Sequence, residues 1–204
     1  MTSDKPRLED SIRVHFAPSL RADGFRGSGR TFRRIVDEAV HVVNVQGFWF
    51  GGRFAVNLGV HPLRLVDVAG KMRAPSKITE SFCAFRTRLG DSLTWHHDGT
   101  SDEMDRAVVD TAAFYRTHAH DFFGLFMGPD SVLQTLTVDS LQAGTYQFEQ
   151  YCMGSVIGVA YEFAKLRREQ GRLSEAKAFA SFALITSTPK FVGHVELQEI
   201  ATSA

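Results

Sequence analysis

The fold of this chain is decided by the stretch Val40-His41-Val42-Val43-Asn44-Val45-Gln46, the turn Gly51-Gly52 and the stretch Phe54-Ala55-Val56-Asn57-Leu58-Gly59-Val60. In the second stretch, large apolar residues alternate with small or polar ones at a period of two. That alternation predicts a β-strand with one buried face and one polar or solvated face. Because the connection is short, we expect the two strands to pair antiparallel.

Two more segments extend this sheet. Thr31 to Val36 reads as a short strand, and Cys83 to Leu89 repeats the alternation. In the second segment we expect Cys83 and Phe85 on the apolar side. The sequence predicts an antiparallel sheet of about four to five strands. Its polar face would collect Asn44, Gln46, Asn57, His61, Arg86 and Arg88.

Helices are expected on both sides of these strands along the chain. Leu8, Ile12 and Phe16 recur at helical spacing, which predicts an amphipathic helix over residues 6–22 that ends at Gly24. A second helix is predicted over 102–127, with Ser101 or Asp102 as its N-cap. We expect these two helices to cover one face of the sheet.

The C-terminal part has a helical pattern. We expect a short helix or turn over 131–141, an αα-hairpin formed by 145–170 and 173–187, and a strand or short helix from Phe191. Residues 62–81 are predicted to be a loop with one irregular element. The fold class is therefore α+β, with a sheet domain at 1–127 and a helical extension at 128–204 packed on it. The hairpin is a packing element or a homodimer surface.

Composition excludes several classes of function. The 204 residues include 44% hydrophobic and 23% charged residues, typical of a globular protein. Lys+Arg and Asp+Glu both number 23, so no global charge attracts nucleic acid or an anionic membrane. No apolar run approaches the roughly 20 residues of a membrane span. We therefore expect neither membrane insertion nor, given the charged N-terminus, secretion.

The cysteines point to a reducing compartment. Cys83 and Cys152 are far apart and form no CxxC motif, which argues against a disulfide framework and a thiolate metal site. We expect a cytoplasmic protein. The basic run from Arg26 to Arg34 is diluted by neighbouring acids and is interpreted as a solvated edge, so a nucleic-acid partner is not expected.

Several of these segments together resemble a known family. They are Gly29-Arg30-Thr31-Phe32-Arg33-Arg34, Val42-Val43-Asn44-Val45-Gln46, Phe54-Ala55-Val56-Asn57-Leu58-Gly59-Val60 and Arg86-Thr87-Arg88-Leu89-Gly90. In order and pattern, residues 8–125 are similar to an uncharacterised bacterial family described as domain of unknown function 4304. The resemblance implies the fold above and a soluble bacterial setting. It supplies no catalytic residues, because the family has no established activity. Gly47-Phe48-Trp49-Phe50 replaces the family's usual lysine-bearing stretch.

The polar sheet face offers candidate ligand contacts. Arg86 and Arg88 are suited to hold a carboxylate or phosphate, because a guanidinium donates in a matching fork. Cross-strand pairing with acids is the interpretation we favour for them. Asn44, Gln46 and Asn57 are unusual in strands. For these three, a ligand role and a local hydrogen-bond network both stay open.

Catalytic and metal motifs are weak. His96-His97-Asp98 invites comparison with a metal site, but adjacent residues in a strand point apart and no further ligands stand at a recognisable spacing. Cys83, with His61 or His96 as a base, is placed on the apolar face, where a thiol is usually inert. GxSxG, Walker A, GxGxxG and HExxH motifs are absent from the sequence. No metal or cofactor is expected.

Three consecutive aromatic residues, Phe48-Trp49-Phe50, occupy the glycine-flanked turn. They either fold onto the core as a plug, which we favour, or form an exposed patch for a partner.

Two functions stay open. The first is a non-enzymatic binding domain that engages a protein or small anionic ligand through the aromatic turn and the polar sheet face. The second is an enzyme acting on an anionic substrate, with a histidine as acid or base. Its pocket would be lined by Asn57, His61, Arg86, Arg88 and His96. We favour the first, because each enzymatic constellation lacks a partner at a demanding spacing.

Overall fold

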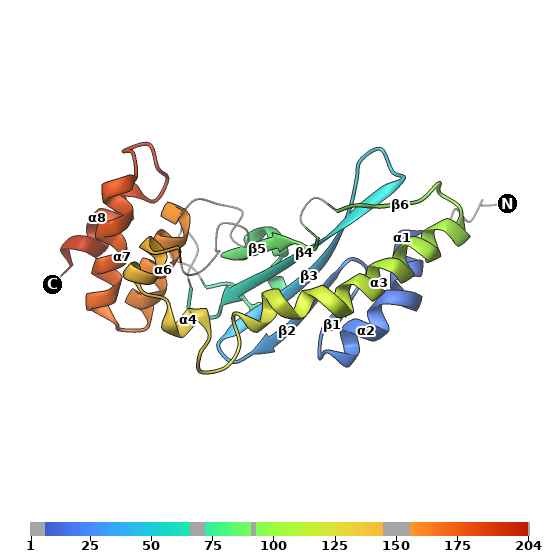
Figure 1. Cartoon of the computed structure of the whole chain (residues 1–204), viewed down its shortest axis with the longest axis horizontal. Helices are drawn as coiled ribbons and strands as arrows, with labels where there is room; N and C mark the ends of the chain where they lie inside the picture. Colours follow the sequence, from blue (N-terminus) through green and yellow to red (C-terminus); the bar gives the residue numbers. More distant parts are fainter. Residues whose placement is uncertain (1–6, 66–71, 91–92, 145–155, 204) are drawn as a thin grey trace.

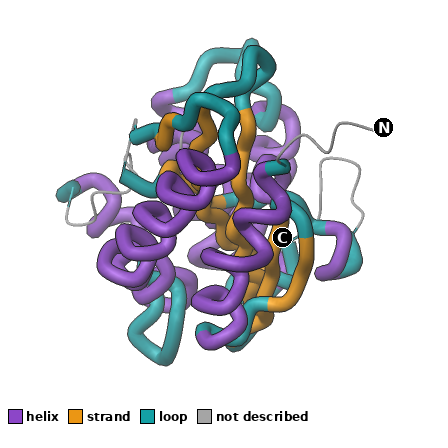
Figure 2. Tube along the Cα trace, turned by 90° about the vertical axis from the view of Figure 1, so that its right-hand side faces the viewer, coloured by secondary structure: helices purple, strands orange, loops and turns teal. Residues whose placement is uncertain are grey.

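The structure is a computed structural model that describes residues 7–65, 72–90, 93–144 and 156–203. The sheet and the helices α1–α3 lie toward one end of the long axis, and the helices α6–α8 lie at the other (Figure 1). Viewed along that axis, the strands lie together beside the helices (Figure 2). The predicted α+β class is confirmed.

The sheet is antiparallel and has six strands in the order β1-β2-β3-β4-β5, with β6 paired to β4. Its register aligns Asn44 with Asn57 and Asn57 with Arg88, so these three residues form a row across β3, β4 and β5. The bounds are β1 Arg26–Ser28, β2 Thr31–Val36, β3 Ala39–Gly47, β4 Arg53–Pro62, β5 Phe85–Arg88 and β6 Trp95–His96.

The β3–β4 hairpin is the longest paired element of the sheet. Gly51 and Gly52 adopt φ angles of 69° and 70°, a region that glycine enters without steric cost, and the Gly51 N–H donates to the Phe48 carbonyl at 3.0 Å. The tip of the hairpin projects beyond the helices that cover the sheet (Figure 1). The predicted hairpin is confirmed.

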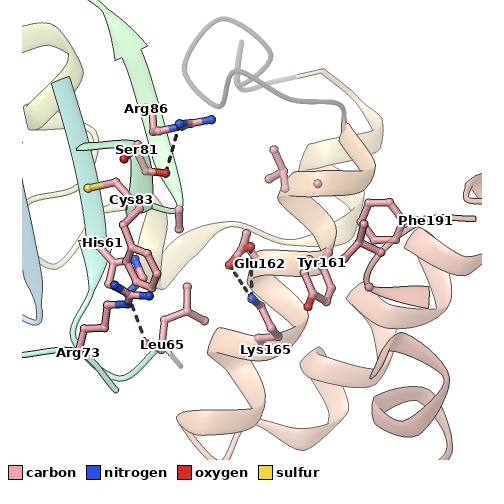
Figure 3. A pocket seen from close by; sticks show the side chains of 16 residues that line it. His61, Leu65, Arg73, Ser81, Cys83, Arg86, Tyr161, Glu162, Lys165 and Phe191 are labelled. Atoms are coloured by element: carbon pink, nitrogen blue, oxygen red, sulfur yellow. Dashed lines mark hydrogen bonds and ion pairs between the residues drawn. The ribbon is translucent and has the colours of Figure 1, made fainter. Parts of the chain in front are cut away.

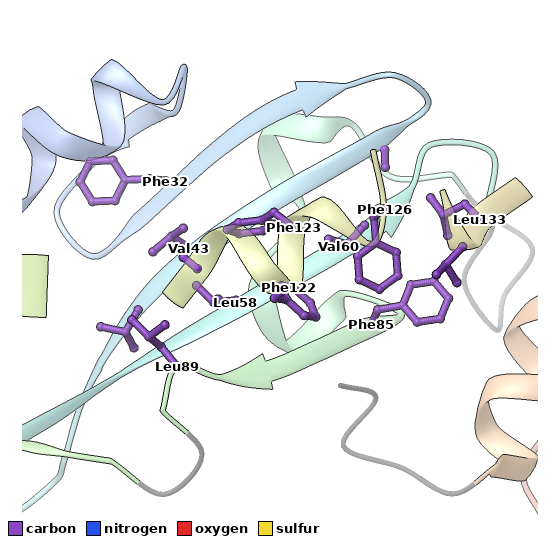
Figure 4. Packing of buried hydrophobic residues seen from close by; sticks show 14 of the residues in the cluster. Phe32, Val43, Leu58, Val60, Phe85, Leu89, Phe122, Phe123, Phe126 and Leu133 are labelled. Carbon is purple, nitrogen blue, oxygen red and sulfur yellow. The ribbon is translucent and has the colours of Figure 1, made fainter. Parts of the chain in front are cut away.

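Helices cover the first face of the sheet, as predicted. The N-terminal segment comprises α1 (Leu8–Ser11), the π-helical turn η1 (Ile12–Phe16) and α2 (Ala17–Ala22), and it packs beside α3 (Ser101–Gly124). The rings of Phe16 and Tyr115 lie edge to face at 5.3 Å. The last turn of α3 and the residues that follow it press Phe122, Phe123 and Phe126 against Val43, Leu58, Val60 and Phe85 of the sheet (Figure 4).

The N-cap of α3 is one residue earlier than predicted. The Thr100 hydroxyl accepts from the Glu103 N–H at 3.4 Å, whereas Ser101 and Asp102 are already helical. Ser101 and Asp102 were plausible because both residue types cap well, but Thr100 has the extended backbone that an N-cap requires.

The second face of the sheet is not solvated along its whole length. The turns η2 (Pro75–Lys77) and η3 (Glu80–Phe82) cross it and bury a small cluster of Val40, Val42, Ile78 and Cys83. Gly59 permits this contact, because a Cβ at that position would lie 2.7 Å from the Cys83 sulfur. His61 and Asn57 on this face are each only 4% exposed. The expectation of a solvated face is wrong for this part.

Cys83 lies on the face opposite to the predicted one. It belongs to the covering cluster, whereas Phe85 belongs to the main core on the other side of the sheet. The reason is local: β5 begins only at Phe85, so the two-residue alternation of a strand does not extend back to Cys83.

The C-terminal region is helical. An αα-hairpin turns at Gly171, whose φ is 76°, and the rings of Phe163 and Phe179 stack at 5.3 Å across it. The predicted hairpin is confirmed for the described residues, and residues 145–155, which were predicted to belong to its first helix, lie outside them. The segment after Phe191 is a helix. The bounds are α4 Val132–Thr135, α5 Val138–Gln142, α6 Val156–Glu169, α7 Leu173–Thr186 and α8 His194–Thr202.

Arg167 of α6 attaches the helical region to the segment that follows α3. Its side chain is fully buried and donates to the carbonyls of Leu133 at 2.6 Å, Gln134 at 3.1 Å and Leu136 at 3.3 Å. Its Nε lies 3.0 Å from the carboxylate of Glu175 on α7. One side chain therefore holds α4, α6 and α7 together. In the described part of the chain, no helix has both the length and the apolar character to span a membrane.

Candidate functional site

A cavity of about 450 Å³ lies between the second face of the sheet and α6. One wall comes from the end of β4, the start of β5 and the turn before it, and the opposite wall comes from α6 and the segment before α8 (Figure 3). The ionisable or aromatic polar side chains on its two walls include His61, Arg73, Arg86, Tyr161, Glu162 and Lys165.

Three cationic side chains from separate segments line the cavity. The Arg86 guanidinium donates to the Ser81 carbonyl at 3.3 Å and lies 3.9 Å from the Glu80 carboxylate. The Arg73 guanidinium lies 3.8 Å from the centre of the Phe82 ring. Lys165 is the third cation.

Lys165 is buried in the helical wall. Its ammonium lies 3.1 Å from Glu162 Oε2 and 4.3 Å from the centre of the Tyr161 ring. Burial raises the pKa of Glu162, and the charge of Lys165 opposes that rise. With three cations against one carboxylate, the described lining carries a net positive charge.

His61 is held neutral beside these cations. Its Nε2 lies 3.3 Å from the Leu65 carbonyl, which can only accept, so this nitrogen carries the proton. The ring lies 5.3 Å from that of Phe82. The pKa of His61 is lowered to about 4, chiefly by burial; the Leu65 hydrogen bond opposes this shift, and the charges of Lys165 and Arg73 add to it. At neutral pH the imidazole is therefore uncharged.

Cys83 lines the same cavity but is not activated. Burial, together with the negative charge of Glu80, raises the pKa of its thiol far above the usual range. The sulfur donates to the Thr79 carbonyl at 3.4 Å. At neutral pH the thiol stays protonated, and the thiolate is the nucleophilic form.

The other sheet residues singled out from sequence lie on the same face but outside the cavity. Asn57 Nδ2 donates to Gln46 Oε1 at 2.9 Å, and Arg88 donates to Asn57 Oδ1 at 3.2 Å and to Gln46 Oε1 at 3.1 Å. Asn44 donates to the Thr31 hydroxyl at 2.9 Å. These bonds form a polar row nearer the hairpin tip. Of the seven predicted ligand-binding residues, only His61 and Arg86 line the cavity.

His96 lies apart from both groups. It pairs with Arg53 in the sheet, is exposed, and its Nε2 lies 3.1 Å from the Thr94 hydroxyl. The neighbouring Asp98 carboxylate accepts from the Thr100 N–H at 2.8 Å and from the Thr100 hydroxyl at 2.6 Å. Among the residues that the structure describes, no group of three or more His, Cys, Asp or Glu side chains is placed to hold a metal ion.

The aromatic turn is exposed. Trp49 and Phe50 are 95% and 96% exposed, and only Phe48 is partly covered, by the Arg53 guanidinium at 4.4 Å. The favoured prediction of a plug on the core is wrong for Trp49 and Phe50. The tip of the β3–β4 hairpin, where the two residues lie, stands clear of the helices that cover the sheet (Figure 1).

Comparison with protein families identifies the family to which the sheet half of the chain is similar. The model of the family described as "Domain of unknown function (DUF4304)" matches residues 16–125, more than half of the chain. The chain belongs to this family. The match includes the whole sheet and α3, and hence the sheet wall of the cavity, whereas α6 lies outside it. No curated protein and no solved structure matches the chain.

Sequence reasoning missed the residues that complete the cavity. Arg73 lies in a segment that was predicted only as a loop, and Glu162 and Lys165 lie on a helix that was interpreted as a packing element. One signal was present: Lys165 interrupts the apolar run Ala160, Phe163, Ala164 and Leu166. A lysine on the buried side of a helix requires a partner, and that requirement indicates a polar site.

Proposed function

We propose that this protein is a non-enzymatic binding domain whose cavity holds a small molecule with a carboxylate or phosphate group. The observation that carries the proposal is the convergence of Arg73, Arg86 and Lys165 on one cavity from three separate segments. The volume of about 450 Å³ lies in the range of small-molecule sites, which is about 300–1,000 Å³.

The charges of the lining favour an anion. Arg73, Arg86 and Lys165 bring three positive charges to the described lining against the one carboxylate of Glu162, and the Glu80 carboxylate lies 3.9 Å from Arg86 outside that lining. A guanidinium offers two parallel donors to a carboxylate or phosphate, and an ammonium adds a point charge. An anion between Arg86 and Lys165 would contact both walls and thereby join the sheet to α6.

Binding is favoured over catalysis by the state of the reactive groups. A general base works best with a pKa near the operating pH, whereas the pKa of His61 is lowered to about 4. Burial moves the pKa of the Cys83 thiol in the opposite direction from activation. Asn57, Arg88 and His96, which the enzyme hypothesis also required, lie outside the cavity. A cytoplasmic location, where thiols stay reduced, fits the free Cys83.

The test is a thermal-shift screen of the purified chain against inorganic phosphate, sugar phosphates and citrate, with neutral sugars as controls. A ligand that binds the native state raises its melting temperature by mass action. We expect a shift with at least one anion, and its loss in Arg86→Ala.

The matched control is Arg88→Ala. Arg88 lies two residues along the same strand and on the same face, but it bonds Asn57 and Gln46 and does not line the cavity. The Arg88→Ala variant should keep the anion-dependent shift. Equal loss in both variants would assign the effect to the general charge of the sheet, and no shift with any anion would contradict the proposal.

A further inference from the structure

The aromatic turn at the tip of the β3–β4 hairpin has the properties of a surface that contacts another protein molecule. Trp49 and Phe50 expose nearly their whole side chains on adjacent positions of one turn. Exposed aromatic pairs are uncommon on surfaces that only face water, and aromatic residues are enriched at the centres of protein interfaces. The turn itself is defined by hydrogen bonds at both ends, from Gly51 N to Phe48 O and from Phe48 N to Arg53 O.

A hollow whose lining suits an aromatic side chain lies on the second face of the sheet, at the β1–β2 edge. It measures about 470 Å³, and its lining is mainly apolar, with Ile35, Val40 and Pro75 among the contributing residues. Arg26 and Arg33 also line it, as does Arg34, whose guanidinium however lies over the Phe25 and Phe123 rings. Ile35, the penultimate residue of β2 and beyond the part of β2 that pairs with β1, is 57% exposed.

The tip cannot enter the hollow of its own chain. Val40 lines the hollow and Gly47 ends β3 at the turn, so seven residue steps of paired strand separate them. At about 3.3 Å per residue, that is roughly 23 Å of hydrogen-bonded strand. Only the hollow of another molecule is accessible to the tip.

We propose that Trp49 and Phe50 of one molecule dock into the arginine-bordered hollow of a second copy of this chain. Aromatic faces carry negative charge density, which matches a cationic border, and an apolar floor accepts the ring. The chain already makes this kind of contact internally: Arg34 lies 4.7 Å from the Phe25 ring and Arg53 lies 4.4 Å from the Phe48 ring. If the contact is reciprocal it closes a two-fold dimer, and otherwise it propagates as an open chain.

The first experiment measures molecular mass by light scattering and sedimentation over a wide concentration range. We expect reversible association for the native chain. Trp49→Ala removes the anchor and Ile35→Glu places a charge on the apolar floor. Each variant should weaken association by about 30-fold or more, as truncation of a buried aromatic anchor does. Both positions are exposed in the single chain, so both variants should fold.

Mixing the two variants gives the decisive result. Trp49→Ala keeps an intact hollow and Ile35→Glu keeps an intact tip, so a mixture restores one productive contact and association recovers in part. Ile185→Ser, which alters an apolar residue that is 83% exposed on α7, is the matched control and should associate like the native chain. A chain that is monomeric at every concentration would overturn the proposal. Association that is lost in Ile185→Ser but kept in Trp49→Ala would assign the contact to the C-terminal helices instead.

Discussion

The two ends of the second sheet face differ sharply, although β3, β4 and β5 form both. Toward α6, the turns over residues 75–83 cover the face, and His61 and Arg86 line the cavity. Toward the hairpin tip, Gln46 and Arg88 lie on an open face that ends in exposed aromatics. The alternation along β4 is the same at both ends. The comparison shows that strand periodicity divides residues between two faces, whereas the character of each face depends on what packs against it.

The largest expected effect comes from detaching the helical wall of the cavity. Arg167→Met keeps most of the side-chain volume but removes the donors to the carbonyls of Leu133 and Leu136. A buried polar group without a partner costs about 1–3 kcal/mol, so we expect the free energy of unfolding to fall by about 3–5 kcal/mol. Denaturant titration measures it. Burial lowers the pKa of Arg167 only to about 10, so the native side chain is charged at neutral pH.

Hydrogen exchange locates the effect of this substitution. Amides of α4 and α6 should lose protection, while those of the β3–β4 hairpin keep theirs. Arg168→Met is the control, because Arg168 is partly exposed and pairs with Glu196, and such pairs contribute about 1 kcal/mol or less. Uniform loss of protection across the chain would mean that the two ends of the face unfold as one unit.

The second effect is a pH dependence at the cavity end. The pKa of His61 is lowered from 6.5 to about 4 in the folded chain. Above pH 6.5 the imidazole is neutral in both states and contributes no slope. As the pH falls from 6.5 to 4, His61 becomes protonated in the unfolded chain but stays largely neutral in the native chain. The free energy of unfolding therefore decreases by roughly 3 kcal/mol because of His61. His41, whose pKa burial lowers to about 3, acts in the same direction.

His61→Gln tests the contribution of the cavity end. Unfolding free energies are measured above pH 6.5 and near pH 4 for the native chain and the variant. The drop between the two conditions should be smaller in the variant, because only His41 and the remaining groups still contribute. An unchanged drop would show that His61 is protonated equally in the folded and unfolded states.

The elements that could be predicted from sequence are those with a local period. The hairpin, the strand over Thr31 to Val36 and the helices that flank the sheet each carry a repeat of two or of about 3.6 residues, and each lies where it was predicted. The segregation of Asn57, Arg86 and Arg88 onto one face followed from the same period. The stop of the first helix also followed, because Gly24 adopts a φ of 84°.

The remainder depended on contacts between segments far apart in sequence. Residues 75–83, which cover part of the second face, form irregular turns, so no sequence period predicted them. Because Cys83 belongs to this segment and not to β5, its side chain lies on the face opposite to the predicted one. The cavity needs α6 opposite β5, a juxtaposition that neither element encodes alone. The exposure of Trp49 depends on how far the hairpin extends beyond α3, which is a property of the assembled layers. For these reasons sequence reasoning found one wall of the cavity and missed the other.

The smallest expected effect lies at the open end and completes the comparison. Arg88→Ala removes two hydrogen bonds, to Asn57 and Gln46, but Asn57 keeps its bond to Gln46 and Arg88 itself is partly exposed. We expect a loss of about 1 kcal/mol or less. In a double-mutant cycle with Gln46→Ala, the coupling should be about 0.5 kcal/mol. A coupling free energy as large as the loss expected for Arg167→Met would mean that the polar row stabilises the fold as strongly as Arg167 does. The two ends of the face would then differ in exposure but not in what holds them together.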